Sequence, residues 1–284
     1  MQAVLNVTRE VNMAEHGDPT GPEQVITIGS VPNFRDIGGY AIAGGGRVRT
    51  GVLYRSAALS GLADADLPAF RSLGIRTVFD LRTGDERGTR PDRTPPGVRT
   101  AVLDVLADAA GSAPAQLESV LSDPAAAARM LGDGGAAPLF EQGYRDIVTL
   151  PSALRSYRQF FTELADAASR PALVHCTTGK DRTGWATAAT LMLLVVAADD
   201  VMNDYLRTNR DLLPALQPLL DEFAAAGGDP GLLRPVVGVE PAYLQTAIAE
   251  MRARFGSIEW YFSDGLGLPD GTIAALRAAL SEVG

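Results

Sequence analysis

The sequence is poor in the residues that bind metals or cross-link small domains. It has one cysteine and two histidines among 284 residues. A single cysteine excludes an internal disulfide, and two histidines without a surrounding cluster of cysteines or carboxylates do not make a zinc site. We therefore expect no metal and no other cofactor. A lone thiol also suits a reducing compartment, so we expect a cytoplasmic protein.

Long apolar runs and positive charge are scarce as well. No segment reaches the ~18 uninterrupted apolar residues that a membrane span requires, and the apolar stretch 186–198 is too short. Residues 1–6 lack a basic flank and a long apolar core, so no signal peptide is predicted, although export without one stays open. The net charge of −9 argues against a nucleic-acid partner. The oligomeric state is not indicated.

The only cysteine lies in the most informative segment, residues 175–184, which read His-Cys-Thr-Thr-Gly-Lys-Asp-Arg-Thr-Gly. The run 171–175 before it is strand-like, and an apolar helical pattern follows from Arg182. Successive backbone N–H groups of such a loop, together with the helix N-terminus behind it, form an anion site and favour thiolate over thiol. The nucleophile and the phosphate-binding loop are therefore predicted to be one segment.

Each position in this loop has a predicted task. Cys176 attacks phosphorus and holds a covalent thiophosphate, while Arg182 offers a planar fork of donors to two phosphate oxygens. Gly179 lets the backbone turn with its N–H groups inward, and Thr183 can hydrogen-bond the sulfur. His175 is expected to brace the loop from the strand end. The predicted substrate-binding residues are Thr177, Thr178, Gly179, Lys180 and Thr183.

Three further groups have weaker support. The segment 33–39 places polar residues beside a Gly-Gly turn. Asp80 and Arg82 end a buried strand pattern, and sites gather at the carboxyl ends of strands in α/β sheets. They are therefore candidates to support the loop from behind, although capping and ion pairing that only fix the fold explain them equally well. Lys180 places a second cation inside the loop. A second cation suits a ligand with more than one phosphate, such as a phosphoinositide.

The loop motif resembles the signature of the bacterial tyrosine/lipid phosphatases of the mycobacterial protein-tyrosine phosphatase B type. The resemblance runs from about residue 30 to the C-terminus and is interrupted near 107–137. It rests on the segments 33–36, 51–56, 80–83, 204–209, 241–244 and 255–261. It implies a compact phosphatase fold without a metal, a helical lid within 199–239, and a phosphorylated protein or phosphoinositide as partner. Phosphotyrosine is the implied substrate, with phosphoserine, phosphothreonine and phosphoinositides as further ones.

The general acid is the least settled part of the predicted mechanism. Tyrosine phosphatases commonly take it from an Asp ahead of the cysteine, often beside Trp, but Trp185 and Trp260 both follow Cys176. Asp181 lies inside the loop, as in the family that the chain resembles, and a bound dianion would favour its protonated form. The other interpretation is that Asp181 pairs with a neighbouring cation and only shapes the loop. Asp146 is the rival acid.

Residue patterns predict an α/β fold with a helical C-terminal half. Alternating strands and helices predict a parallel sheet with crossover helices, forming a single domain over 23–284 behind a flexible segment 1–22. Composition predicts a mobile loop or weak helix near 107–137. The expected strands are 24–28, 40–43, 47–54, 75–81, 98–105 and 171–175, and the expected helices are 64–73, 138–148, 151–168, 200–208 and 213–226.

Three other functions can be weighed against a phosphatase. A phospholigand-binding module without turnover would lack the cysteine or the arginine, and both are present. A nucleotidase with a phosphate-binding P-loop would need Ser or Thr after Lys180, where Asp181 stands instead. A rhodanese-type sulfurtransferase shares the strand, cysteine loop and helix, but usually has a different loop length and no Arg-Thr-Gly. A sulfurtransferase-like activity remains the alternative that an assay with thiosulfate would test.

Overall fold

The computed structural model describes residues 28–109, 123–132 and 135–282. Its centre is a five-stranded sheet in the order β1-β3-β6-β4-β5. Strands β3, β6, β4 and β5 are parallel, and the edge strand β1 is antiparallel to β3. The strands are β1 (Arg35–Asp36), β3 (Leu53–Ser56), β4 (Thr77–Asp80), β5 (Arg99–Val102) and β6 (Ala172–His175), and a separate pair joins β2 (Arg47–Val48) to β7 (Ser281–Glu282).

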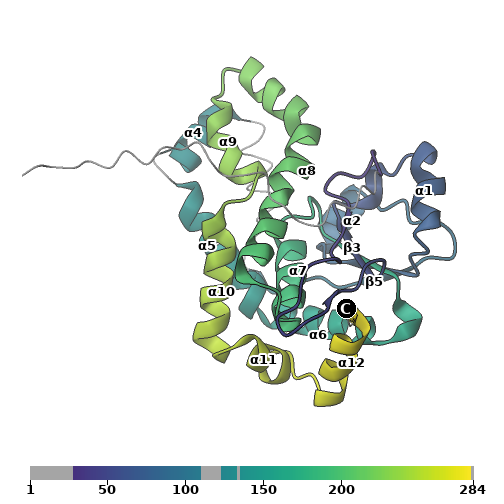
Figure 1. Ribbon diagram of the computed structural model, residues 1–284. Coiled ribbons are helices and arrows are strands. Elements are labelled where there is room, and N and C mark those ends of the chain that lie inside the picture. Colours follow the sequence, from purple (N-terminus) through teal and green to yellow (C-terminus); the bar gives the residue numbers. More distant parts are fainter. Residues whose placement is uncertain (1–27, 110–122, 133–134, 283–284) are drawn as a thin grey trace, which may run out of the picture.

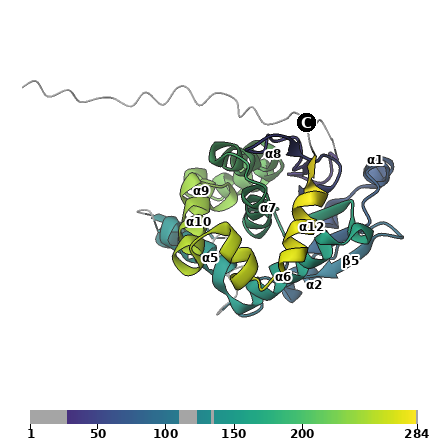
Figure 2. The same cartoon turned by 60° about the horizontal axis from the view of Figure 1, so that its bottom comes forward.

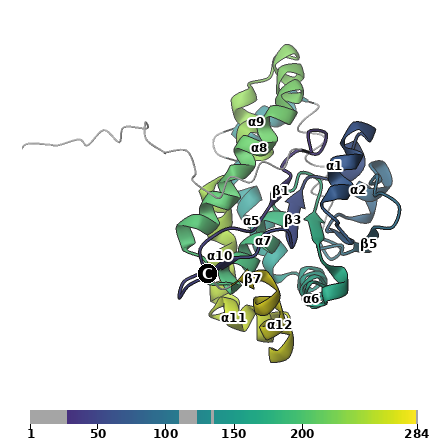
Figure 3. The same cartoon turned by 45° about the vertical axis from the view of Figure 1, so that its right-hand side comes forward.

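The register of the sheet brings three strand ends together. His175 at the end of the central strand β6 lies opposite Ser56 of β3 and Asp80 of β4. Because the three strands are parallel, the loops that follow them leave the same edge of the sheet. The loop after His175 is therefore flanked by chain from both neighbouring strands. Figure 3 shows the side of the sheet on which β1, β3 and β5 are labelled.

Successive residues of the strands point to opposite faces of the sheet, and both faces are covered. Val174 and Phe79 belong to the main hydrophobic core, whereas Leu173 and Val78 belong to a smaller core. The smaller core includes Phe70 of α1 (Leu67–Ser72). On the main side lie α5 (Ala136–Thr149), α6 (Pro151–Ala165), α7 (Arg182–Leu193), α10 (Pro241–Phe255) and α12 (Asp270–Leu280).

Helix α7 is the centre of the helical part. Of its 12 residues, 11 are buried, so it is apolar or tightly packed on every side, as expected for a core helix. It contacts α5, α8 (Ala198–Ala225), α10 and α11 (Ile258–Trp260), and Figure 2 shows it in the middle of these helices. Since α7 begins at the end of the cysteine loop, the loop is anchored in the best-packed part of the protein.

A third group of apolar side chains lies at the far end of α8, at the top of Figure 1. Here the second half of α8 packs with α4 (Pro124–Leu131) and α9 (Pro230–Val237). We call this group the distal cluster. Its buried members are Ala127, Leu131, Phe223, Leu233, Val236 and Val237. No helix of the described ranges has both the length and the hydropathy needed to cross a membrane.

The α/β fold, the mostly parallel sheet and the helical C-terminal half confirm the sequence-based expectation. The two helices expected at 200–208 and 213–226 are wrong, because α8 is continuous through both. Leu212 is buried within it, and Asn209 bonds the backbone of Val239 with its side chain instead of ending the helix. Within 107–137, the described residues include α4 and the start of α5.

The shorter expected elements have mixed outcomes. The helix expected at 64–73 is a 3-10 turn, Asp64–Asp66, followed by α1. The strands expected at 40–43 and 47–54 meet across the turn at 44–46 only in a bridge between Ala41 and Arg47. The range 47–54 is instead divided between β2, which pairs with β7, and the start of β3. The strand expected at 24–28 falls almost wholly outside the described residues, as does the segment 1–22.

Candidate active site

The cysteine loop, residues 176–181, connects β6 to α7. The two neighbouring strands hold its start: the Leu81 amide donates to the His175 carbonyl at 2.9 Å, and the Ala58 amide donates to the Thr177 carbonyl at 3.1 Å. Cys176 is 1% exposed. The thiol is therefore buried, at the edge of the sheet where the parallel strands β3, β4 and β6 end.

The backbone amides of this loop are not used within the fold. From Thr177 to Arg182, no backbone N–H donates a hydrogen bond to another atom of the described residues. Buried amides are normally paired, so consecutive unpaired ones next to a helix N-terminus form an anion site. The hydroxyl of Thr183 is likewise buried without a partner in the described part of the chain. These donors suit an anion and a thiolate.

Gly179 is required by the close approach of the loop to β3. Its φ is +69°, a conformation that favours glycine, and a Cβ at this position would lie 2.2 Å from the Ser56 carbonyl oxygen. Neighbouring side chains bind the carbonyl oxygens of the loop. Asn33 Nδ2 donates to the Gly179 and Thr178 oxygens at 2.9 and 3.1 Å. Arg55 Nη2 also donates to the Gly179 oxygen, at 2.7 Å. The carbonyls are thereby held away from the anion site.

Arg182 is held in place by Glu86 of α2 (Gly84–Thr89). Both terminal guanidinium nitrogens are 2.7 Å from a carboxylate oxygen of Glu86, and Thr177 Oγ1 donates to the same carboxylate. Burial raises the pKa of Glu86, but the hydrogen bonds and charge of Arg182 outweigh it and bring the pKa to about 2. Burial lowers the pKa of Arg182, but the same pair and the nearby sulfur raise it overall. Both groups are therefore charged at neutral pH.

Lys180 is the only lysine of the chain, and it is buried. Its Nζ lies 3.0 Å from Asp181 Oδ1 and 4.6 Å from the centre of the Phe140 ring of α5. A cation over an aromatic face is stabilised by the ring quadrupole. The second cation expected in the loop is thus present, and it is oriented by α5.

Of the two candidate acids, Asp181 is the one that lies in the loop and contacts other site residues. Tyr144 of α5 donates a hydrogen bond of 2.7 Å to Asp181 Oδ1, and the Asp181 side chain is 28% exposed. Asp146 instead accepts from Gln142 on its own helix. The structure brings Asp181 together with Cys176 and Arg182 in one loop, and it gives Asp146 a partner elsewhere.

Behind the loop, Asp80, Arg82 and His175 form one buried network, together with Asp92. Arg82 Nη2 lies 2.7 Å from Asp80 and 2.8 Å from Asp92. His175 Nε2 lies 3.0 Å from Asp92, and its Nδ1 lies 3.0 Å from the Cys176 carbonyl oxygen. Burial raises the pKa of Asp92, but His175 and Arg82 lower it below its ordinary value. This contact chain leads from the end of β4 to the backbone of the cysteine.

Asp80, Asp92 and His175 also have the donor atoms of a metal site, the one such group within the described residues. However, the guanidinium of Arg82 already contacts both carboxylates and offsets one of their two negative charges. A cation in the same place would meet a fixed positive charge. We therefore interpret this group as an ion-pair network that supports the loop.

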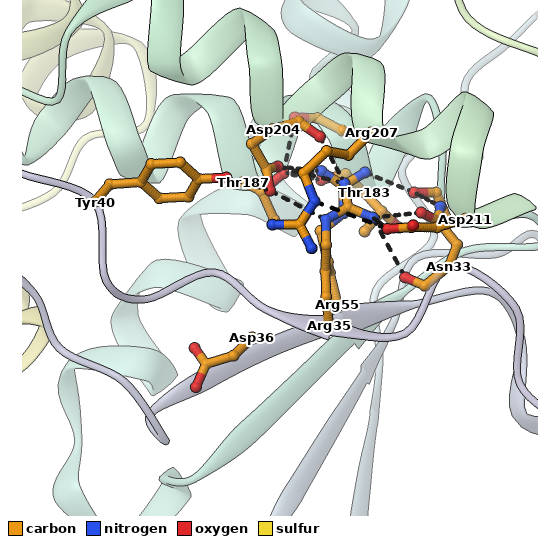
Figure 4. A network of polar contacts seen from close by, with 12 residues as sticks. Asn33, Arg35, Asp36, Tyr40, Arg55, Thr183, Thr187, Asp204, Arg207 and Asp211 are labelled. Atoms are coloured by element: carbon orange, nitrogen blue, oxygen red, sulfur yellow. Dashed lines mark hydrogen bonds and ion pairs between the residues drawn. The ribbon is translucent and has the colours of Figure 1, made fainter. Parts of the chain in front are cut away.

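A second buried network connects the loop to α8 (Figure 4). Asp204 of α8 lies 3.0 Å from Arg35 and 2.8 Å from Arg55, and each of the three side chains is at most 2% exposed. Burial raises the pKa of Asp204, but the two arginines outweigh it and lower the pKa well below its ordinary value. Since Arg55 also binds the Gly179 carbonyl, one carboxylate of α8 helps to fix the shape of the loop.

Several residues of this site were not predicted as site residues. Asn33 and Arg55 lie in segments that carry the family resemblance, but nothing in their pattern showed that they bind the loop. Glu86 follows Thr83 at the spacing of a capping box, which the structure confirms, so the sequence signal indicated a helix start only. Asp92 and Tyr144 had no local signal, because the residues through which they reach the loop, His175 and Asp181, lie far along the chain.

Comparisons with known proteins agree with this geometry. The sequence profile of the tyrosine phosphatase family matches residues 26–282. The triple specificity protein phosphatase PtpB of Mycobacterium tuberculosis is 33% identical over 273 residues, covering 87% of this chain and 96% of that protein. A protein of Cupriavidus necator, provisionally named a tyrosine-protein phosphatase, is 31% identical, and the match covers 85% of this chain and 84% of that protein. A tyrosine-protein phosphatase of Nostoc commune is 26% identical over 240 residues, and the match covers 81% of this chain and 74% of that protein.

Proposed function

We propose that this chain, which belongs to the tyrosine phosphatase family, hydrolyses phosphate monoesters through a covalent phosphocysteine on Cys176. One observation carries the proposal: the sulfur begins a loop whose backbone N–H groups from Thr177 to Arg182 have no acceptor in the described residues. Such a loop binds a phosphate dianion with its phosphorus directly above the nucleophile.

In the first step, the Cys176 thiolate attacks phosphorus and forms an S–P bond while the bond to the leaving oxygen breaks. The loop amides and the N–H groups on the edge of Arg182 that faces away from Glu86 bind the three equatorial oxygens, where charge is spread in the transition state. Asp181 gives its proton to the leaving oxygen, which departs as an alcohol or phenol. The products of this step are the neutral leaving group and phosphocysteine.

In the second step, a water molecule attacks the phosphorus of phosphocysteine. Asp181, now ionised, takes a proton from that water, the S–P bond breaks, and inorganic phosphate leaves with the thiolate restored. The Thr183 hydroxyl, buried and without a partner among the described residues, can donate to the sulfur as negative charge returns to it. This donor makes the thiolate a better leaving group.

We propose phosphotyrosine as the principal substrate, with phosphoserine, phosphothreonine and phosphoinositides as further ones. Two observations support this range. Lys180 adds a second buried cation beside Arg182, which suits a second phosphate group, and the name of the Mycobacterium tuberculosis relative gives that protein three specificities. For this chain the range is to be measured with matched phosphotyrosyl, phosphoseryl and phosphoinositide substrates.

The test of the proposal is to trap the intermediate. The protein is mixed with a phosphotyrosyl substrate labelled in the phosphoryl group, quenched in acid, and digested for mass spectrometry. We expect label on the peptide containing Cys176, and none in Cys176→Ser, which should still bind a phosphate analogue such as tungstate. Turnover by Cys176→Ser, or a labelled histidine peptide, would contradict the thiolate mechanism. A thiosulfate assay tests the sulfurtransferase alternative in parallel.

A further inference from the structure

Two buried tyrosines form a short chain of hydrogen bonds that ends on Asp181. The hydroxyls of Tyr144 and Tyr205 are 2.5 Å apart, and the Tyr144 hydroxyl is 2.7 Å from Asp181 Oδ1. Both side chains are 1% exposed. Burial, and next to it the charge of Asp181, raises the pKa of each phenol well above its ordinary value, so both carry their proton.

The direction of these hydrogen bonds follows from the number of protons. A phenol has one proton to donate, and an ionised carboxylate can only accept. Tyr144 therefore donates its hydroxyl hydrogen bond to Asp181, and the Tyr205 hydroxyl must donate to the Tyr144 oxygen. Because Tyr144 accepts one hydrogen bond while it donates another, the two bonds polarise each other in the same direction.

Packing fixes both phenols relative to the loop. Tyr205, on α8, lies against Gly184 of α7, where an added Cβ would be 3.1 Å from its ring. The rings of Tyr144 and Tyr205 meet edge to face at 6.3 Å, and the other side of Tyr144 packs on Tyr243 of α10 at 5.5 Å. The position of the Tyr144 hydroxyl is thus set by three helices packed around it.

These contacts make the two oxygens of the Asp181 carboxylate unequal. Oδ1 accepts from Tyr144 at 2.7 Å and from Lys180 at 3.0 Å. Within the part of the chain that the structure describes, no donor is assigned to Oδ2. With Oδ1 held on the protein side, Oδ2 is the oxygen that can carry a proton to the leaving group and later take one from water.

We infer that Tyr144, supported by Tyr205, is a positioning residue for the acid–base step: it holds Oδ1 of Asp181 so that Oδ2 faces the reacting phosphate ester. The inference rests on the proposed function, in which Asp181 is the general acid. It adds that the orientation of this acid comes from α5 and α8, and not from the loop alone.

A pH dependence follows, given the groups that face Asp181. These are Lys180 and Arg182 from the loop and α7, Tyr144 from α5, Tyr157 from α6, Tyr205 from α8 and Tyr243 from α10. Tyr144 is the phenol that donates directly to the carboxylate. Its hydrogen bond stabilises the ionised form. Removing that hydroxyl favours the protonated form, so the basic limb of the kcat/KM profile should move to higher pH.

The experiment compares Tyr144→Phe with wild type on a series of phosphate monoesters whose leaving groups range from acidic phenols to alkyl alcohols. A poor leaving group needs the proton and a good one does not. We expect kcat/KM to fall about 10-fold for the alkyl esters and less than about 2-fold for the most acidic phenol, as a misplaced acid predicts. Tyr205→Phe should give a smaller effect of the same kind. The matched control is Tyr54→Phe, a buried phenol on β3 that stacks on Phe34 and takes no part in this chain of hydrogen bonds.

Asp181→Asn separates this inference from the proposed function. If Asp181→Asn shows the leaving-group-selective loss but Tyr144→Phe loses equally on all esters, or leaves the basic limb in place, the positioning role is overturned while the acid assignment stands. If Asp181→Asn is not selective, the acid assignment fails, and the inference fails with it. Tyr144→Phe should add less than about 2-fold in the Asp181→Asn background, since residues that act as a unit are not additive.

Discussion

Glu86 binds both terminal nitrogens of Arg182, each at 2.7 Å, although 96 positions separate the two residues. A guanidinium held by two parallel hydrogen bonds cannot rotate freely. The edge of Arg182 that faces away from Glu86 is therefore aimed before any substrate arrives. The carboxylate is in turn fixed by Thr83 and Thr177, so α2 determines the geometry of the phosphate site.

Replacing Glu86 by Gln should reduce activity more than binding of a simple anion. The amide keeps the volume but loses one of the two acceptors for Arg182, so the fork loses its orientation. We expect kcat/KM for an aryl phosphate to fall about 10²-fold, as small misplacements of positioning groups do. Asp85→Asn is the matched control, since Asp85 is exposed on the same helix. Equal losses in both variants would show an effect of charge alone.

The same pair predicts how stability depends on pH. The pKa of Glu86 is about 2 in the folded protein against an ordinary 4.5. The ionised group therefore stabilises the fold fully above about pH 4.5, and this contribution is lost as the pH falls toward 2. It corresponds to about 3 kcal/mol.

Urea unfolding of wild type and Glu86→Gln at pH 7, 5, 4 and 3.5 checks this expectation. The difference in unfolding free energy should be largest at pH 7 and 5, and should shrink at pH 4 and below. A difference that does not change across this range would mean that Glu86 is not stabilised by its charge.

Gly179→Ala should displace the loop. The substitution adds a Cβ 2.2 Å from the Ser56 carbonyl oxygen and imposes a φ of +69° on alanine, which costs about 1–2 kcal/mol in backbone strain alone. We expect loss of phosphate-analogue affinity together with loss of kcat. Gly88→Ala is the control, because nothing lies within 4 Å of its added Cβ. Tungstate binding at wild-type affinity in Gly179→Ala would contradict the steric argument.

Asp204→Asn tests whether α8 supports the loop. Removing the charge leaves Arg55 buried without its carboxylate partner and Arg35 with Asp211 alone, at 3.6 Å. Breaking a buried ion pair typically costs about 3–5 kcal/mol. We expect a lower thermal midpoint and, in the folded fraction at low temperature, a reduced kcat. Asp199→Asn in the exposed first turn of the same helix controls for the loss of an acidic residue. Full activity below the midpoint would limit Asp204 to stability.

The lid expected within 199–239 is a proposal that the distal cluster makes testable. Leu233 is fully buried in that cluster. Leu233→Ala should therefore destabilise the packing of α9 on α8, at a cost of about 3 kcal/mol in folding free energy. If these helices cover the site, peroxide should inactivate Cys176 faster in this variant, and KM for bulky substrates should fall. The control is Glu222→Gln, next to the cluster but exposed. Inactivation at the wild-type rate would assign α9 to structure only.

The sequence predicted the part of the site that is contiguous. Cys176 and Asp181 lie in the cysteine loop and Arg182 begins the helix after it. The spacing of these residues in sequence was enough to predict a phosphate site. The supporting residues could not be predicted in the same way. Asn33, Glu86 and Tyr144 contact that segment from a turn ahead of β1, from α2 and from α5, and only the packing of the chain brings them there.

The error about α8 has a related cause. The predicted helices 200–208 and 213–226 left residues 209–212 outside any helix. In the structure Asp211 forms ion pairs with Arg207 and Arg210, and its carbonyl accepts from the Asn33 amide. A polar turn of helix that is used by tertiary contacts looks like a loop in sequence. Tertiary contacts, and not local preference, decided this element.

The chain has one lysine and one cysteine, and both lie in the phosphate loop, four residues apart and almost fully buried. Apart from the N-terminal amine, amine-selective reagents therefore have a single side chain to modify, and thiol-selective reagents have a single thiol. The mass gained after brief exposure to either class of reagent would report directly whether the loop is occupied. The native protein thus carries its own pair of chemical reporters, and no residue has to be introduced to follow ligand binding.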